Sequence, residues 1–196
     1  MICSLKPKSI IIAFFPILCL AAKTGMRSGE LYALTWGDVD FERNLITVSK
    51  QWTKKDGLTA TKNRGNRIVP ISQDLNKFLH ELKHVETPNS DPVLPRLVEW
   101  THGEQSKVLR EFCKATNIKE VKFHDLRATF ITNMLSQGVP LVKVMSIVGH
   151  KKMETTDIYL RLAGVDIKGA TDALTYTVPA TTEIHDNVIS VNFSKA

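Results

Sequence analysis

Apolar residues along the chain follow two periods, and each period predicts its own kind of element. Residues 10–22 form an uninterrupted apolar run, which predicts a buried helix that breaks or kinks near Pro16. A second helix is expected to begin at Arg27. In residues 46–54 apolar and polar side chains alternate, as they do in a strand, and the Asp-Gly dipeptide at 56–57 is a strong signal for a hairpin turn.

Two further short strands complete a small sheet. The second strand is expected at 58–61, and an NRGN turn leads into the third at 67–71. Helices are expected at residues 73–84, 107–116, 124–136, 140–148 and 164–174, and a short one, capped by Thr155 or Thr156, is expected to present Tyr159. The chain is therefore predicted to be mainly α with a small three-stranded antiparallel β-sheet.

The pattern also predicts how the chain is organised. Residues 1–178 are expected to form one domain, and residues 179–196 a C-terminal tail. The tail is first polar and then apolar at NVISVNF, so it could add a strand to a sheet edge in the same molecule or in a neighbouring one. A chain of 196 residues with 43% hydrophobic and 23% charged residues is long enough for one sizeable core.

The net charge of the chain indicates a class of partner, and its cysteine content indicates a compartment. The chain has 26 Lys and Arg against 20 Asp and Glu, and its net charge of +6 favours an anionic partner. Its three cysteines are scattered without a CxxC motif, which indicates neither a disulfide scaffold nor a thiolate metal site. The reducing cytoplasm is the expected compartment.

Two patterns resemble signals of other protein classes. Lys6 and Lys8 before the apolar run, and two alanines at its end, match a signal peptide. The run is too short to span a bilayer, and its removal would delete the element that leads into Arg27, so we favour a core helix.

HELKH, from His80 to His84, matches the HExxH pattern of zinc peptidases. Lys83 is atypical of that pattern, and no motif marks a third ligand, so no metal site is expected.

Four motifs carry candidate chemistry. They are TGMRSGE with Arg27, TKNRGNRIVP with Lys62, FHDLR with His124 and Arg127, and GHKKMETTDIY with His150 and Tyr159. Each is weak alone. Arg27 could simply pair with Glu30, three residues along a helix, and Tyr159 could be a packing residue. All four occur in one order, however, and that combination is far more specific than any single motif.

In this order the motifs resemble those of the tyrosine recombinases, the phage integrases and their chromosomal relatives, over roughly residues 9 to 178. The resemblance implies an integrase-type catalytic domain that breaks and rejoins DNA through a 3'-phosphotyrosyl bond. All six positions of the family's catalytic set are filled, and the set consists of Arg27, Lys62, His124, Arg127, His150 and Tyr159.

The resemblance assigns a role to each position. Arginines match a phosphate with a planar fork of donors, so Arg27 and Arg127 are expected to clamp it. Lys62 is expected to protonate the leaving 5'-oxygen, and Tyr159 to be the nucleophile. The two histidines would orient or deprotonate the tyrosine and donate hydrogen bonds to the phosphate. Most of the other cations near Lys62 are expected to contact phosphates or to be solvated; these cations are Lys54, Lys55, Arg64 and Arg67.

The resemblance also implies partners and alternatives. We expect double-stranded DNA, four protomers in the synaptic complex, a monomer alone, and no cofactor, obligatory metal or membrane. About eight residues precede the apolar run, where the family usually has further DNA-binding domains, so we expect a catalytic fragment or else a natural minimal form that binds DNA weakly. A type IB topoisomerase uses similar residues, but the compact GH-to-Tyr spacing favours a recombinase. A catalytically idle DNA-binding regulator would form no covalent DNA adduct.

Overall fold

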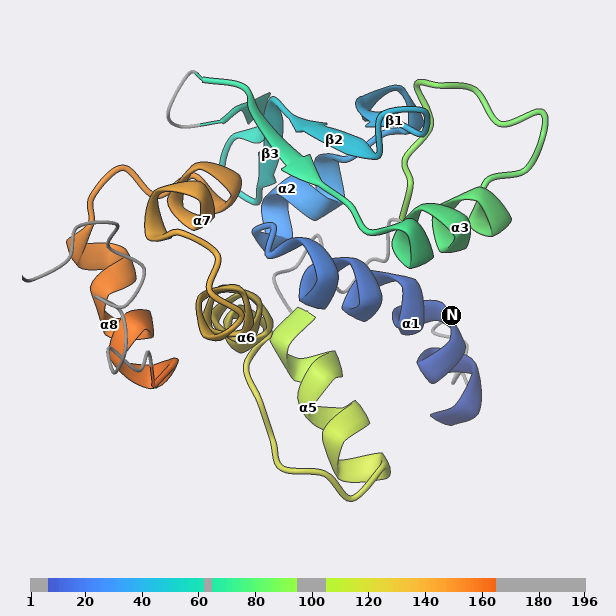
Figure 1. Cartoon of the computed structure of the whole chain (residues 1–196). Coiled ribbons are helices and arrows are strands. Elements are labelled where there is room, and N and C mark those ends of the chain that lie inside the picture. Colours follow the sequence, from blue (N-terminus) through green and yellow to red (C-terminus); the bar gives the residue numbers. More distant parts are fainter. Residues whose placement is uncertain (1–6, 62–64, 95–104, 165–196) are drawn as a thin grey trace, which may run out of the picture. The chain divides into compact units, whose positions relative to one another are not determined.

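The chain begins with a long helix, alternates between short helices and strands, and then continues with helices (Figure 1). The computed structural model describes residues 7–61, 65–94 and 105–164. The helices are α1 (Pro7–Thr24), α2 (Ser28–Ala33), α3 (Gln73–Leu82), α5 (Gln105–Ala115), α6 (Phe123–Ser136), α7 (Leu141–Val148) and α8 (Glu154–Leu162), with a 3₁₀ turn η1 (Trp36–Asp38). The strands are β1 (Val39–Asp40), β2 (Leu45–Val48), β3 (Lys50–Thr53), β4 (Gly57–Ala60) and β5 (Arg67–Pro70).

The predicted mainly helical fold with a small three-stranded antiparallel sheet is confirmed, but the strands are not those expected. The predicted strand at 46–54 divides at Ser49 into β2 and β3. β2 pairs with β5 and with β1, which the pattern did not indicate, and β3 forms a separate hairpin with β4 across the predicted turn. Burial explains the pairing. Ile46 and Val69 face each other across β2 and β5 and are fully buried, whereas Leu58 on β4 is 59% exposed.

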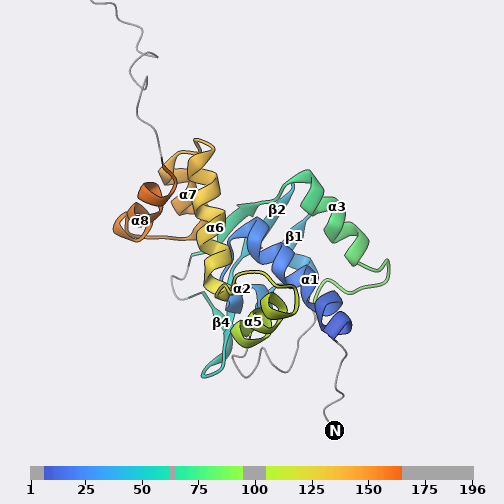
Figure 2. The same cartoon turned by 90° about the horizontal axis from the view of Figure 1, so that it is seen from below.

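Helix α1 belongs to the core, as predicted for the apolar run. Its buried residues recur every three or four positions and include Phe14, Ile17, Leu20 and Ala21. This face packs against α6 and α2 (Figure 2). Of the two outcomes expected near Pro16, a break or a kink, the break does not occur, since α1 continues through this residue. Of the helices that the structure describes, none is both long and apolar enough to cross a membrane.

The ends of the other helices agree with the predictions where Gly or Pro marks them. α5, α6 and α7 begin and end within two residues of the expected positions. Gly149 ends α7 in the left-handed conformation, with φ of 72°. The helix from Arg27 is shorter than expected, because α2 ends at Ala33 before the 3₁₀ turn. The predicted helix at 164–174, the tail at 179–196 and the domain boundary at 178 lie outside the described residues.

The HELKH segment packs on aromatic rings. Helix α3 ends at Leu82, so His84 lies beyond it and does not share a helix face with His80. The His80 ring stacks on Phe41, with 4.1 Å between centroids, and the Lys83 ammonium lies 5.7 Å from the same ring. Within the described part of the chain, no three or more His, Cys, Asp or Glu side chains are grouped as metal ligands would be.

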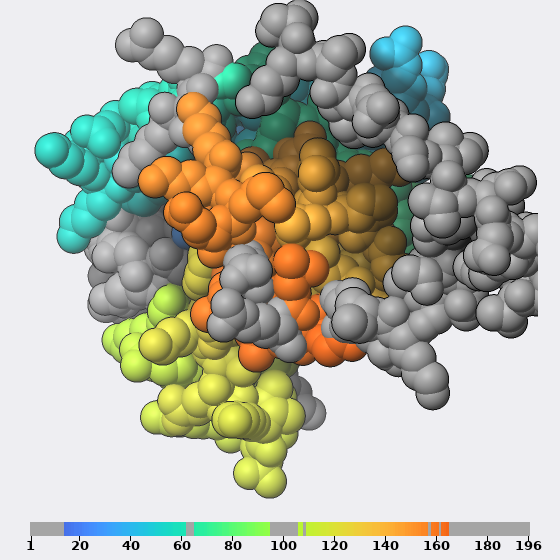
Figure 3. Space-filling model, turned by 60° about the vertical axis from the view of Figure 1, so that its left-hand side comes forward, coloured from blue at the N-terminus to red at the C-terminus, as the bar shows by residue number. Residues whose placement is uncertain are grey.

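Helices α7 and α8 pack against α6 around a second apolar cluster. Its buried members are Ile131, Leu135, Val144 and Val148. Figure 3 looks onto this side of the molecule, where α8 and the loop before it are orange. Helix α8 begins at Glu154, so Thr155 and Thr156 lie inside its first turn, and the prediction that one of them caps the helix is wrong. The side chain of Thr156 is fully buried instead.

Candidate active site

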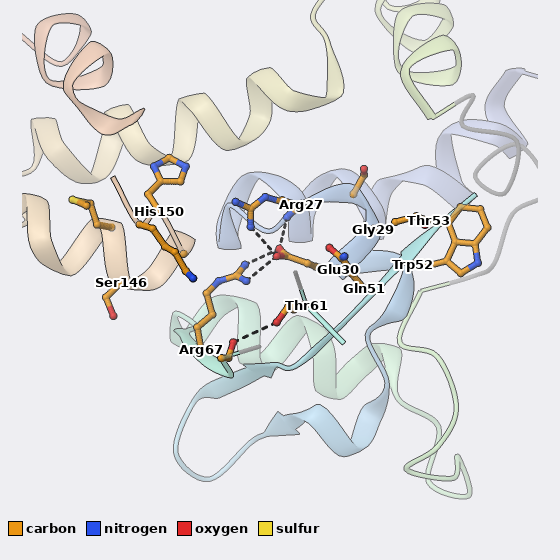
Figure 4. A pocket seen from close by; sticks show the side chains of 15 residues that line it. Arg27, Gly29, Glu30, Gln51, Trp52, Thr53, Thr61, Arg67, Ser146 and His150 are labelled. Carbon is orange, nitrogen blue, oxygen red and sulfur yellow. Dashed lines mark hydrogen bonds and ion pairs between the residues drawn. The ribbon is translucent and has the colours of Figure 1, made fainter. Parts of the chain in front are cut away.

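Two adjoining pockets bring the separate motifs together. The larger, of about 590 Å³, lies between the start of α2, strands β3 and β5, and the end of α7, and its lining includes Arg27, Arg67 and His150 (Figure 4). The smaller, of about 270 Å³, is lined by Arg27, His124 and Arg127, among others. Arg27 lines both pockets. It therefore connects residues whose motifs are about a hundred positions apart in the sequence.

Arg27 is held at the start of α2 by Glu30. Its backbone N–H donates to Glu30 Oε2 at 2.7 Å, and its Nη1 donates to Glu30 Oε1 at 3.0 Å. The pairing with Glu30 that the spacing allowed is therefore present. The Arg27 side chain remains 43% exposed, so its other donors face the pockets. Gly25, with φ of 60°, makes the preceding turn, and a Cβ there would collide with the Phe130 ring.

Arg67 is the second partner of Glu30. Its Nη1 and Nη2 donate to the two Glu30 carboxylate oxygens at 2.8 and 2.6 Å (Figure 4). Its Nε donates to Ile147 O at 2.8 Å. Arg67 is thus not a plainly solvated charge, because its side chain is 12% exposed and pairs with Glu30. Burial alone would raise the pKa of Glu30, but its hydrogen bonds and charge interactions with Arg67 and Arg27 lower that pKa below its usual value.

Arg127 connects the Gly25 turn to the end of α7. It is 2% exposed, and it donates from Nη1 to Gly25 O at 2.5 Å and from Nη2 to Val148 O at 2.6 Å. Burial, and then repulsion by Arg27, lowers the pKa of Arg127 to about 10, so the side chain stays charged at neutral pH. Two of its five N–H groups make these bonds, while the guanidinium also lines the smaller pocket.

The two histidines lie in different surroundings. His124, on the first turn of α6, is exposed and lines the smaller pocket beside Arg27 and Arg127. His150 follows the Gly149 cap and is partly buried, and its Nδ1 lies 2.9 Å from Thr156 Oγ1. Burial, and then the charges of Arg127 and Arg27, lowers the pKa of His150 to about 4. The His150 ring is therefore neutral near pH 7.

Tyr159 lies beside His150. The two ring centroids are 6.4 Å apart, and the ring planes make an angle of 23°. Tyr159 is half-buried on α8 and packs against the α6–α7 cluster. Its ring is thus close to one of the candidate phosphate-binding groups, although Tyr159 is not among the described residues that line either pocket.

Lys62 lies outside the described residues, but its flanks do not. Thr61 and Gly65, on either side of residues 62–64, both line the larger pocket. The Thr61 hydroxyl donates to Gly65 O at 3.4 Å. The described residues on either side of Lys62 therefore lie at the pocket that contains Arg27 and His150.

Two residues of this site, Arg67 and Thr156, have contacts that the sequence pattern does not indicate. Nothing in the sequence relates Arg67 to Glu30, because they lie 37 positions apart and meet only through the pairing of β5 with β2. Thr156 was expected at a helix cap, and its contact with His150 was not foreseen. A threonine one helical turn before Tyr159 was the available signal, since the two side chains share a helix face.

Known proteins resemble the chain in sequence and in fold. The model of the phage integrase family matches residues 2–164. Tyrosine recombinase XerA of Pyrococcus furiosus is 30% identical over 164 residues, which are 80% of this chain and 52% of XerA. The Tn1549 transposon integrase, solved in complex with a circular intermediate DNA, has a TM-score of 0.62 at 20% identity, over 86% of this chain and 63% of that one. The catalytic domain of bacteriophage HP1 integrase has a TM-score of 0.57 at 23% identity, over 81% and 80%.

The sequence identity and the coverage of each match determine whether it shows a shared fold or a shared family. The structural likenesses lie below 25% identity and show a shared fold. The chain spans about half the length of the curated relatives it matches. The family match, in contrast, covers most of the sequence and includes the Arg27 turn, both histidine motifs and Tyr159, so the chain belongs to the phage integrase family.

Proposed function

We propose that the chain is the catalytic part of a site-specific DNA recombinase, which cleaves a DNA strand and rejoins it through a 3'-phosphotyrosyl bond at Tyr159. One observation carries the proposal. Arg27, Arg127 and the two histidines, which come from three separate motifs, surround two adjoining pockets, and Tyr159 lies beside His150. This arrangement supplies positive charge, hydrogen-bond donors and a nucleophile at one place.

The two arginines bind the scissile phosphate. Charge builds up on the non-bridging oxygens in the transition state, so fixed cations with several donors stabilise it more than they stabilise the bound substrate. Arg27 offers the exposed part of its guanidinium, and Glu30 sets its direction. Arg127 is held from behind by Gly25 O and Val148 O, which keeps its charge in place without rearrangement during the reaction.

The remaining groups carry out the nucleophilic attack and the proton transfers. Tyr159 gives its phenolic proton to His124 and attacks the phosphorus, the bond to the 5'-oxygen breaks, and Lys62 protonates that oxygen as general acid. His150 donates a hydrogen bond to the phosphate, and His124 does so once it carries the proton from Tyr159. The phosphotyrosyl bond retains the energy of the diester. Attack by a free 5'-hydroxyl then reverses the step, with neither ATP nor an obligatory metal ion.

Double-stranded DNA is the proposed partner. The net charge of +6 and the cationic pockets suit a polyanion, and the Tn1549 integrase with the same fold was solved with DNA. Because recombination of two duplexes requires four strand cleavages, we propose that four protomers assemble on DNA and that the free chain is a monomer. The cytoplasm is the proposed compartment.

The test is the covalent intermediate. The chain is incubated with nicked or half-site duplexes that carry candidate attachment sites from the genomic neighbourhood, so that the cleaved end diffuses away and cannot be rejoined. Denaturing electrophoresis should show a slower, protein-linked DNA band, and peptide mapping should place the DNA on Tyr159. Tyr159→Phe should bind the same DNA and form no adduct, and EDTA should leave the wild-type reaction intact.

Other results would contradict the proposal. An adduct on Tyr32 or Tyr176 would identify a different nucleophile, and loss of activity with EDTA would make the reaction metal-dependent. DNA binding without an adduct on any substrate would support the idle regulator instead.

A further inference from the structure

Thr156 connects the helix of the nucleophile to His150. Its side chain is fully buried in the first turn of α8, and its Oγ1 lies 2.9 Å from His150 Nδ1. Thr156 and Tyr159 are three residues apart on α8 and therefore share a helix face. One hydrogen bond thus relates the ring of His150 to the helix that carries Tyr159.

The direction of this hydrogen bond follows from the full burial of Thr156, because a buried hydroxyl proton needs an acceptor. On α6, the hydroxyls of Thr129 and Thr132 donate to the carbonyl oxygens four residues earlier, at 2.9 Å in both cases. The Thr156 hydroxyl lies against the His150 ring instead, so its proton is available to Nδ1. A neutral imidazole that accepts at Nδ1 carries its own proton on Nε2.

The charges around His150 keep the ring neutral, which makes its tautomer important. Burial, together with Arg127 and His124 of α6, Arg27 before α2 and Arg67 of β5, lowers the pKa of His150 to about 4. A neutral ring has a single N–H, so it is either a donor or an acceptor toward a ligand in the pocket. An anionic phosphate oxygen requires a donor, whereas the hydroxyl of a tyrosine that gives up its proton requires an acceptor.

We propose that Thr156 is a positioning residue that holds His150 in the Nε2–H tautomer, which is the form in which a neutral ring can donate from Nε2 to the scissile phosphate. The assignment rests on the proposed function. It gives a structural reason for the donor role of His150. The position of α8 and the position of the proton on His150 then depend on each other, because the Thr156 hydroxyl contributes to both.

The first test reads the tautomer directly and needs no variant. In the full chain labelled with ¹⁵N-histidine, long-range ¹H–¹⁵N correlations distinguish a protonated from an unprotonated ring nitrogen. We expect His150 to have the proton on Nε2 near pH 7. A proton on Nδ1 would overturn the proposal, whether or not the chain cleaves DNA.

The second test compares three variants. Thr156→Val keeps the shape and removes the hydroxyl, Thr156→Ser keeps the hydroxyl, and Thr155→Val makes the same change at the exposed neighbouring position. We expect Thr156→Val alone to give a mixture of tautomers, and to slow adduct formation about tenfold, which corresponds to the loss of one ordinary hydrogen bond. Thr156→Ser should retain the wild-type tautomer and rate.

The two tests distinguish failure of the role of Thr156 from failure of the proposed function. Absence of an adduct with the wild-type chain counts against recombinase activity, while the NMR result still tests the tautomer. An unchanged tautomer in Thr156→Val, with or without a slower reaction, would show that Thr156 only packs. Equal losses in Thr156→Val and Thr155→Val would also overturn the proposal.

Discussion

Arg67 and Glu30 form a bidentate ion pair, with 2.8 and 2.6 Å between their nitrogen and oxygen atoms, beside the pocket that contains Arg27. The Glu30 side chain is 1% exposed and that of Arg67 is 12% exposed. Because Arg67 also binds Ile147 O, the pair connects α2, β5 and the end of α7. The position of Arg27 and the position of His150 therefore depend on the same two side chains.

Removal of one partner should destabilise the fold. Arg67→Met leaves a buried carboxylate without its strongest partner, so the free energy of unfolding should fall by roughly 3–5 kcal/mol. Urea denaturation measures this change. The double variant Glu30→Gln/Arg67→Met should recover part of the loss, because it leaves no buried charge. Lys23→Met breaks the exposed pair with Asp74 and should leave the midpoint nearly unchanged. Equal midpoints for Arg67→Met and the wild type would contradict this role.

Gly149 and Gly138 offer a matched comparison. Both have a left-handed backbone, with φ of 72° and 78°. A Cβ at Gly149 would lie 3.1 Å from Arg67 Cδ, whereas a Cβ at Gly138 has nothing within 4 Å. Gly138→Ala should cost only the backbone strain, about 1–2 kcal/mol. Gly149→Ala should cost a further 1–3 kcal/mol or so from overpacking and should also slow adduct formation. Similar unfolding free energies for the two variants would contradict the contact with Arg67.

His150 should titrate well below an ordinary histidine. Its pKa is lowered to about 4 by burial and by the surrounding arginines. In the unfolded chain the pKa returns to about 6.5. Between these values the unfolded chain binds more protons, so the contribution of His150 to stability is fully present above pH 6.5 or so, and is lost as the pH falls toward 4. An NMR titration of the ring in the folded and urea-unfolded chain checks this, and a folded midpoint near 6.5 would contradict it.

Lys62 should be the residue whose loss is rescued by a better leaving group. Lys62→Ala is expected to slow cleavage by roughly 10² to 10⁴, the usual effect of losing a general acid. A substrate with sulfur in place of the 5'-bridging oxygen has a leaving group that needs no proton, so it should restore much of the rate. Lys54→Ala and Lys55→Ala serve as controls. If sulfur rescues either control variant and not Lys62→Ala, the general acid is a different lysine.

The sequence by itself determined the local elements. Gly138, Pro140 and Gly149 limit α6 and α7 through their backbone preferences, and the Asp-Gly turn sets the β3–β4 hairpin. These effects act within a few residues and can be read from a short window. The order of the motifs likewise indicated the family, because each motif contributes one chemically required side chain.

Only the tertiary structure decided which distant groups meet. The pairing of β2 with β5 depends on the mutual burial of Ile46 and Val69, and it places Arg67 beside Glu30. Arg127 reaches Gly25 across 102 positions, and Thr156 reaches His150 because α8 folds back against α6. Such contacts form when helices and strands bury their apolar faces together, and that packing depends on the whole chain rather than on any one segment.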